Sequence, residues 1–131
     1  METIKMLYTQ GFSATAKSQD VFQEILSDHY QSYSSTLGKS KNELMGMMQY
    51  FQQLVPNMKW EIKQIINEGN QYVVRCEVTG NPNGDFMGTT TDGSKSFKIM
   101  TIHTFKMENG QVIEMYYVED WGTAMQQLMN E

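Results

Sequence analysis

The sequence predicts an α+β fold in which helices come first along the chain, strands follow, and a short helix closes the chain. Up to Pro56 the apolar residues recur at helical spacing, whereas from Trp60 onward they recur at every second position. The pair Asn109-Gly110 lies between two alternating runs and is the strongest local sign of a β-hairpin. Helices followed by antiparallel strands pack on one face of a sheet, and a strongly curved sheet leaves a cavity between the two layers.

Composition indicates one globular domain over residues 1–131. Hydrophobic residues make up 40% and charged residues 19%, which is enough for a single core. The net charge of -5 and the lack of a basic patch exclude a nucleic-acid partner. No apolar run is long enough to cross a membrane, and Cys76 is the only cysteine, so we expect a cytoplasmic protein. Two histidines and one cysteine cannot build a closed zinc site, and no spacing indicates another metal or a cofactor.

Two helices are predicted in the first 28 residues. Thr3 is expected to cap the first helix, which Gly11 shortens or bends. Ser18 is expected to cap the second helix, which ends near Asp28. The loose alternation over residues 29–33 predicts a short strand or an irregular edge segment.

The third helix is the best defined, because both of its ends carry a signal. Ser40 and Glu43 fit a capping box, and Pro56 stops the helix. Its apolar stripe includes two of the 12 methionines of the chain, Met47 and Met48. The methionines are expected to fill irregular gaps in the core or, alternatively, to line a pocket for an apolar ligand.

Strands are predicted from Trp60 to Ile66 and from Tyr72 to Thr79, and the alternation is strict in the second of them. The turn-rich stretch from Gly80 to Gly93 follows. It is either a surface connection or a flap over a pocket mouth. The closing hairpin is predicted to consist of strands over residues 99–107 and 112–118, with a short helix entered at Asp120.

The register of this hairpin decides which side chains share a face. If Asn109 and Gly110 are the two central turn residues, His103 lies opposite Tyr116 and shares a face with Asp120. The lysines of the first strand fall on the other face, so the face of His103 is the expected interior. In this register Asp120 lies about 13 Å along the strand from His103, which excludes a direct contact between them unless a bulge or sharp bend intervenes.

Each of these three residues has a structural and a chemical interpretation. Asp120 is either a helix N-cap, worth about 1 kcal/mol, or a buried base with a pKa raised by desolvation. His103 is either a satisfied buried ring or an acid/base in a pocket. Tyr116 either packs on His103 or donates a hydrogen bond to a developing enolate oxygen.

The segment from Ile102 to Leu128 resembles the closing hairpin and helix of the SnoaL-like polyketide cyclases, within the nuclear-transport-factor-like superfamily. The glycine-rich stretch Gly80–Gly88 and the segment after Pro56 also resemble that family. The residues that carry the resemblance in the hairpin and helix are His103, Lys106, Asn109, Gly110, Glu114, Tyr116, Asp120, Gln127 and Leu128.

The resemblance implies a cone-shaped α+β barrel, also described as cystatin-like or nuclear-transport-factor-like. Its curved antiparallel sheet holds N-terminal helices on the concave face, encloses one deep pocket, and commonly packs into a homodimer. In the cyclases, an aspartate at the position of Asp120 is the base that removes an acidic C–H proton from a polyketide ester before an aldol closure.

Together these observations predict a protein that binds a small apolar molecule with a carbonyl group, with Asp120, His103 and Tyr116 as catalytic residues of a cyclase or isomerase. The alternative is a non-enzymatic ligand-binding or dimerisation module. The aromatic and methionine side chains expected to bind the substrate are Tyr30, Tyr33, Met48, Phe51, Phe86, Phe105 and Trp121.

Overall fold

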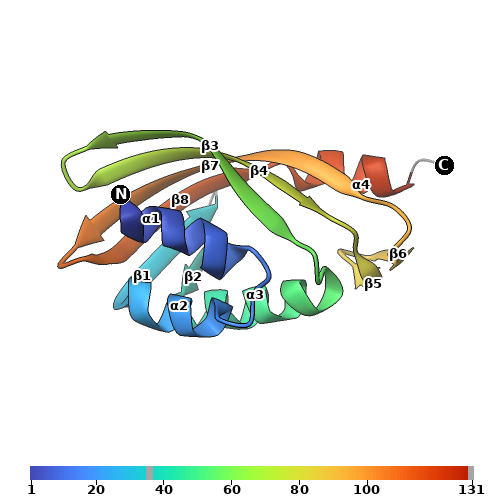
Figure 1. The fold of residues 1–131 in the computed structure, drawn as a ribbon, viewed down its shortest axis with the longest axis horizontal. Coiled ribbons are helices and arrows are strands. Elements are labelled where there is room, and N and C mark those ends of the chain that lie inside the picture. Colours follow the sequence, from blue (N-terminus) through green and yellow to red (C-terminus); the bar gives the residue numbers. More distant parts are fainter. Residues whose placement is uncertain (35–36, 130–131) are drawn as a thin grey trace.

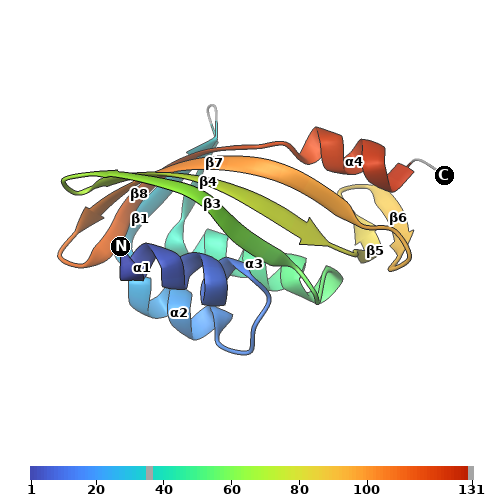
Figure 2. The same ribbon diagram turned by 45° about the horizontal axis from the view of Figure 1, so that its top comes forward.

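A curved six-stranded sheet arches over helices from the N-terminal half of the chain in the computed structural model, which describes residues 1–34 and 37–129 (Figures 1 and 2). The strand order in the sheet is β2-β1-β8-β7-β4-β3, and β5 and β6 form a separate hairpin. In chain order the elements are α1 (Glu2–Met6), η1 (Leu7–Phe12), α2 (Ser18–Ile25), β1 (Leu26–Ser34), β2 (Leu37–Ser40), α3 (Lys41–Leu54), β3 (Lys59–Glu68), β4 (Gln71–Gly80), β5 (Asn83–Phe86), β6 (Thr89–Asp92), β7 (Phe97–Glu108), β8 (Gln111–Glu119) and α4 (Trp121–Met129).

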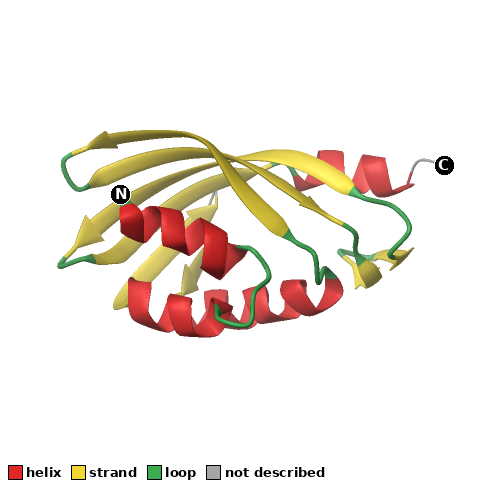
Figure 3. Cartoon of the chain, in the orientation of Figure 1, coloured by secondary structure: helices red, strands yellow, loops and turns green. Residues whose placement is uncertain are grey.

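The predicted α+β class is confirmed, with helices on the concave face and a short closing helix (Figure 3). One pairing differs from an antiparallel sheet, because β1 runs parallel to β8 and makes the sheet mixed. The register of this parallel pair shifts between Leu26 and Gln31. That irregularity explains why the apolar alternation of this segment is loose in the sequence.

The first helix changes its winding halfway along. After α1 the chain continues as a π-helical turn, η1, closed by a hydrogen bond from the backbone N–H of Ser13 to the carbonyl of Tyr8 at 3.1 Å. A Cβ on Gly11 would lie 3.1 Å from the ring of Phe22, so glycine lets α2 pack closely against this turn. The wide turn directs the rings of Tyr8 and Phe12 toward the sheet, where both lie within 6 Å of the ring of His103.

The helix caps were predicted with mixed success. The capping box of α3 is confirmed, because the N–H of Glu43 donates to the Ser40 hydroxyl at 3.3 Å and the N–H of Ser40 donates to the Glu43 carboxylate at 3.0 Å. The caps at Thr3 and Ser18 are wrong, since α1 begins at Glu2 and α2 begins with Ser18 itself. The Ser18 hydroxyl instead donates toward the carbonyls of the preceding turn.

The glycine-rich stretch after β4 forms the small β5–β6 hairpin at the end of the sheet, close to α4 (Figure 1). Its Phe86 is fully buried and packs against Phe51, Phe97 and Trp121, with ring centroids 5.7 to 5.9 Å apart. This stretch therefore covers one end of the core.

The closing hairpin turns at the predicted residues, since Asn109 and Gly110 both have positive φ and Glu108 pairs with Gln111. Its predicted register is wrong beyond that point. Ile113 has no partner, because Met107 pairs with Val112 and Lys106 pairs with Glu114. A bulge of one residue moves every later side chain of β8 to the opposite face of the sheet.

As a result, His103 lies opposite Tyr117 and not opposite Tyr116. The concave face of β8 beyond the bulge carries Met115, Tyr117 and Glu119. The predicted interior position of His103 is confirmed, because its side chain is 1% exposed.

None of the described helices has the length and the apolar composition that crossing a bilayer requires.

Candidate active site

A polar network is buried where β7, β8 and η1 meet. His103 Nε2 lies 2.7 Å from Glu119 Oε2, and His103 Nδ1 is hydrogen-bonded to the hydroxyl of Tyr8. The indole N–H of Trp121 donates to the other carboxylate oxygen, Glu119 Oε1, at 2.8 Å. Four side chains from three separate parts of the sequence thus form one connected chain of hydrogen bonds.

Aromatic rings enclose His103 on several sides. The rings of Tyr8, Phe12, Trp60 and Phe105 lie with their centroids 5.7 to 5.9 Å from the imidazole. Both ring nitrogens therefore depend on Tyr8 and Glu119 for their hydrogen bonds, since water has no access to a side chain that is 1% exposed.

The direction of the hydrogen bonds follows from the chemistry of the end groups. Burial, reinforced by the nearby Cys76 and Glu119, raises the pKa of the Tyr8 phenol well above its usual range, so Tyr8 keeps its proton and donates it to Nδ1. The ring proton of a neutral imidazole then resides on Nε2 and is donated to Glu119, which accepts as a carboxylate. This assignment satisfies every polar atom of the pair with Glu119 ionised.

Glu119 also lies on the wall of a narrow apolar cavity between α3 and the concave face of the sheet. Its side chain is 15% exposed, and among the described residues that line the cavity it alone carries a charge. The cavity measures about 20 Å³, which is room for about one water molecule. The lining residues are Phe12, Leu44, Met47, Met48, Phe51, Met58, Trp60, Met115, Tyr117, Glu119 and Trp121.

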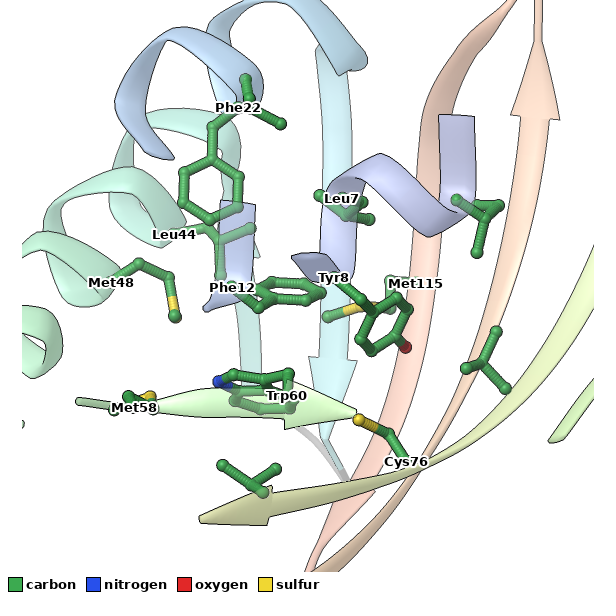
Figure 4. Packing of buried hydrophobic residues seen from close by; sticks show 14 of the residues in the cluster. Leu7, Tyr8, Phe12, Phe22, Leu44, Met48, Met58, Trp60, Cys76 and Met115 are labelled. Carbon is green, nitrogen blue, oxygen red and sulfur yellow. The ribbon is translucent and has the colours of Figure 1, made fainter. Parts of the chain in front are cut away.

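Four of these lining residues are methionines, from α3, β8 and the segment before β3. Figure 4 shows Met48 and Met58 on one side of Trp60, with Phe12 above its ring. Methionine side chains are unbranched and change rotamer easily, which suits them to the wall of a pocket that adapts to its ligand. Other methionines, such as Met87 and Met100, are exposed and have no part in the cavity.

Larger depressions lie on the surface, including one of about 300 Å³ between β6 and the end of α4. Another of about 420 Å³ lies beside the turn of the closing hairpin. Neither contains the buried network, and their walls are largely polar loop and strand-edge residues. The narrow cavity with Glu119 is therefore the better candidate for chemistry.

The structure does not bring the three predicted catalytic residues together. His103 belongs to the network, but Tyr116 is 51% exposed on the convex face and stacks on Tyr33 at 5.1 Å. Asp120 is exposed, and its carboxylate accepts hydrogen bonds from the Thr123 hydroxyl at 2.7 Å and the Thr123 N–H at 3.4 Å. These contacts are those of an N-cap of α4.

The predicted substrate-binding residues divide into two groups. Met48, Phe51 and Trp121 line the cavity. The others do not line it, since Tyr33 stacks on Tyr116 at the convex face while the remaining three are buried in the core: Tyr30, Phe86 and Phe105.

Sequence reasoning missed Tyr8, Trp60 and Glu119. Tyr8 and Trp60 read as ordinary apolar positions of a helix and a strand. The predicted register did not include the bulge at Ile113 and therefore placed Glu119 on the wrong face of the sheet. The only signal for Glu119 was its position next to Asp120.

Cys76 is a buried free thiol. Burial raises its pKa to about 12, so the thiolate is scarce at neutral pH. Within residues 1–34 and 37–129, no three His, Cys, Asp or Glu side chains come together to hold a metal ion.

The curved mixed sheet over N-terminal helices has the ketosteroid isomerase-like fold. A hypothetical protein from Catenulispora acidiphila with that fold superimposes with a TM-score of 0.78 at 7% identity, over 97% of this chain and 92% of the other.

The model of the SnoaL-like polyketide cyclase family matches residues 6–128, so the chain belongs to this family. A Jannaschia sp. CCS1 protein, described as a candidate SnoaL-like polyketide cyclase, is 23% identical, with a TM-score of 0.88 over 99% of this chain and 91% of its own. IdmH from Streptomyces antibioticus, described as a candidate polyketide cyclase, is 20% identical, with a TM-score of 0.84 over 97% of this chain and 96% of its own. A comparison with curated proteins finds no match.

Proposed function

We propose that this protein binds a small, apolar, carbonyl-bearing molecule in the cavity beneath the sheet and removes a proton from a carbon next to the carbonyl. The observation that carries the proposal is the carboxylate of Glu119, which lies on the wall of an otherwise apolar cavity and is backed by His103. Membership of a polyketide cyclase family supports the same chemistry.

Glu119 has the properties that a base for a carbon acid needs. Each carboxylate oxygen accepts one hydrogen bond and keeps a further lone pair free. The bonds from His103 and Trp121 fix its orientation, and the narrow apolar cavity leaves it little contact with water. His103 and Tyr8 do not line the cavity, so they act as positioning residues that orient the carboxylate.

The reaction begins when the C–H bond of the substrate breaks, the proton goes to Glu119, and the electron pair moves into the enolate. In an isomerase the proton returns from Glu119 to another carbon of the same molecule. In a cyclase the enolate carbon attacks a second carbonyl group, and the alkoxide that forms takes the proton back. Both courses leave Glu119 ionised for the next turnover.

The test compares Glu119→Gln with Asp120→Asn, two neighbouring substitutions that each remove one charge. We expect the wild-type protein to accelerate exchange of the α-hydrogens of 2-tetralone in heavy water, followed by proton NMR. Glu119→Gln should slow this exchange by about 10²–10⁴-fold, the usual contribution of a positioned base. Asp120→Asn should exchange normally and keep its fold, since Asn caps a helix about as well as Asp.

Loss of exchange in Asp120→Asn together with normal exchange in Glu119→Gln would contradict this assignment. A wild-type protein that 2-tetralone stabilises against heat without exchange would support the non-enzymatic ligand-binding alternative.

We also propose that the protein forms a homodimer through the convex face of the sheet. Val118 is 75% exposed there and lies near Met100, Ile102 and Tyr116, each at least 40% exposed. Exposed apolar side chains that neighbour one another on the outer face of a sheet, as Ile102 and Val118 do in paired strands, are typical of a contact with another protein surface. We expect light scattering to give a dimeric mass for the wild type and a monomeric mass for Val118→Lys, and a monomeric wild type would refute the proposal.

The cytoplasm remains the proposed location. A single buried cysteine without a disulfide supports it, because disulfides are rare in that compartment. Fractionation of cells that express the protein tests this location directly.

A further inference from the structure

We propose that the indole N–H of Trp60 donates a hydrogen bond to the carbonyl oxygen of the ligand and to the enolate oxygen that forms from it. Trp60 lies near the start of β3, is 4% exposed, and lines the same cavity as Glu119. This inference deepens the proposed function and rests on it for the identity of the site.

The key observation is that the Trp60 N–H is buried and has no hydrogen-bond partner among the described residues. A buried indole N–H normally has a partner, and leaving a donor unsatisfied costs about 1–3 kcal/mol. The hydroxyls of Ser32 and Thr101 also have no partner in the described part of the chain, but neither lines the cavity. Trp60 therefore combines an unused donor with a position on the wall of the site.

The second tryptophan of the chain provides a comparison within the same cavity. Trp121 also lines the cavity, but its N–H is already bound to Glu119 at 2.8 Å. Of the two indoles, only Trp60 keeps a donor for a ligand.

Neighbouring groups fix the ring of Trp60 in place. Its centroid lies 5.0 Å from that of Phe12 and 5.7 Å from that of His103, and its backbone N–H donates to the Ser13 hydroxyl at 2.9 Å. Figure 4 shows the indole nitrogen at the end of the ring that faces Met48 and Met58, which are both cavity residues. A ligand that displaces these methionine side chains would place its oxygen next to this donor.

The arrangement defines the chemical class of the ligand more narrowly. The lining offers the unpartnered N–H of Trp60, the carboxylate of Glu119 and the hydroxyl of Tyr117, which accepts a hydrogen bond from Lys39 at 3.3 Å. These neutral donors and one carboxylate, in walls that are otherwise apolar or weakly polar, fit an uncharged ketone or ester. Among the described lining residues there is no cation to balance a ligand carboxylate, and Glu119 would repel one. The hydrogen bond that the Trp60 N–H donates strengthens as negative charge develops on the enolate oxygen, so Trp60 would stabilise the transition state more than the bound substrate.

The experiment uses Trp60→Phe, which removes the N–H and keeps an aromatic ring. The probes are 2-naphthol, a stable mimic of the enol of 2-tetralone, and naphthalene, which has the same ring system without the oxygen. Binding of each is measured by equilibrium dialysis. We expect Trp60→Phe to weaken 2-naphthol binding roughly tenfold, the value of one hydrogen bond, and to leave naphthalene binding unchanged.

Equal changes for the two ligands would overturn the inference, because they would mean that Trp60 only shapes the cavity. Failure of the wild type to bind either ligand would overturn it as well. Exchange of 2-tetralone separates this inference from the proposed function. If 2-naphthol depends on Trp60 but the wild type exchanges nothing, the proton transfer fails and the donor stands. If exchange depends on Glu119 but Trp60→Phe changes the binding of neither ligand, the proposed proton transfer stands and the role of Trp60 as a donor fails.

Discussion

The two faces of the closing hairpin depart from the usual pattern of apolar side chains inside and polar side chains outside. Its concave face buries His103 and Glu119, two groups that prefer water, while its convex face exposes Tyr116 and Val118. The buried groups are tolerated because each has a hydrogen-bond partner. We propose above that the exposed apolar side chains are buried against a second copy of the chain in a homodimer.

One residue decides which side chains reach which face. Ile113 is the extra residue of the bulge, and beyond it the faces of β8 are exchanged. If Ile113 were instead paired with Lys106 in a regular ladder, Tyr116 and Val118 would point into the core and Glu119 would point away from His103. The position of the candidate base is thus a consequence of strand register and not of local sequence.

The most severe way to break this difference is to shift the register of β8 beyond the bulge by deleting Met115. The shortened strand can pair with β7 in two ways. Either Glu114 takes the buried place opposite Phe105, or Tyr116 and Val118 turn inward and Glu119 turns away from His103. We expect a loss of more than about 4 kcal/mol in the free energy of unfolding, which is visible as a missing cooperative transition in urea.

Deletion of Ile113 is the matched control. It removes the residue of β8 that has no partner in β7, and it leaves Val112 opposite Met107 and Glu114 opposite Lys106. Every later side chain of β8 keeps its face, so this deletion should cost much less stability. Equal losses in the two deletion variants would mean that register does not decide which side chains of β8 are buried.

The bulge also marks the limit of what the sequence predicts. Local signals specified the α3 capping box and the Asn109-Gly110 turn, because both depend on residues a few positions apart. The overall α+β class followed from the change of period at Trp60. No local pattern distinguishes Ile113 from its neighbours, since a bulge reflects the packing of β8 against both β7 and β1.

The candidate site was predictable only in part for the same reason. His103 was identified as an interior residue, because the alternation along β7 is unbroken and places the lysines of the strand on the opposite face. Tyr8 and Trp60 contact His103 from η1 and β3, which are distant from it in the sequence. No spacing of residues within a single helix or strand predicts such contacts. The predicted base, Asp120, lies one position from Glu119, which occupies the interior face. An unforeseen bulge shifts the predicted register by this one residue.

A milder way to test the contrast is to truncate two adjacent residues of β7 that face opposite sides. His103→Ala leaves the Tyr8 hydroxyl and the Glu119 carboxylate without their shared partner, so we expect a loss of about 3–5 kcal/mol from two unsatisfied groups and a cavity. Thr104→Ala, on the exposed face, should change the stability by about 0.5 kcal/mol or less. Urea unfolding measures both, and similar losses would mean that the network contributes little to stability.

The smallest expected effect is a dependence of stability on alkaline pH. Burial raises the pKa of Tyr8, so the folded protein retains a proton that the unfolded chain loses above about pH 10. The unfolded state then binds fewer protons than the folded state, and the free energy of unfolding falls as pH rises, by up to about 1.4 kcal/mol per pH unit for this group.

Tyr8→Phe should remove this contribution and make the fall above pH 10 shallower, although Tyr30 and Cys76, whose pKa values burial also raises, keep a residual slope of the same sign. Tyr116→Phe removes a hydroxyl from the exposed face and should leave the slope as in the wild type. Urea unfolding of the three proteins across this pH range compares the two faces directly. Equal slopes in Tyr8→Phe and Tyr116→Phe would mean that the Tyr8 hydroxyl is not held away from water, and the hydrogen-bond direction assigned to His103 would fall with it.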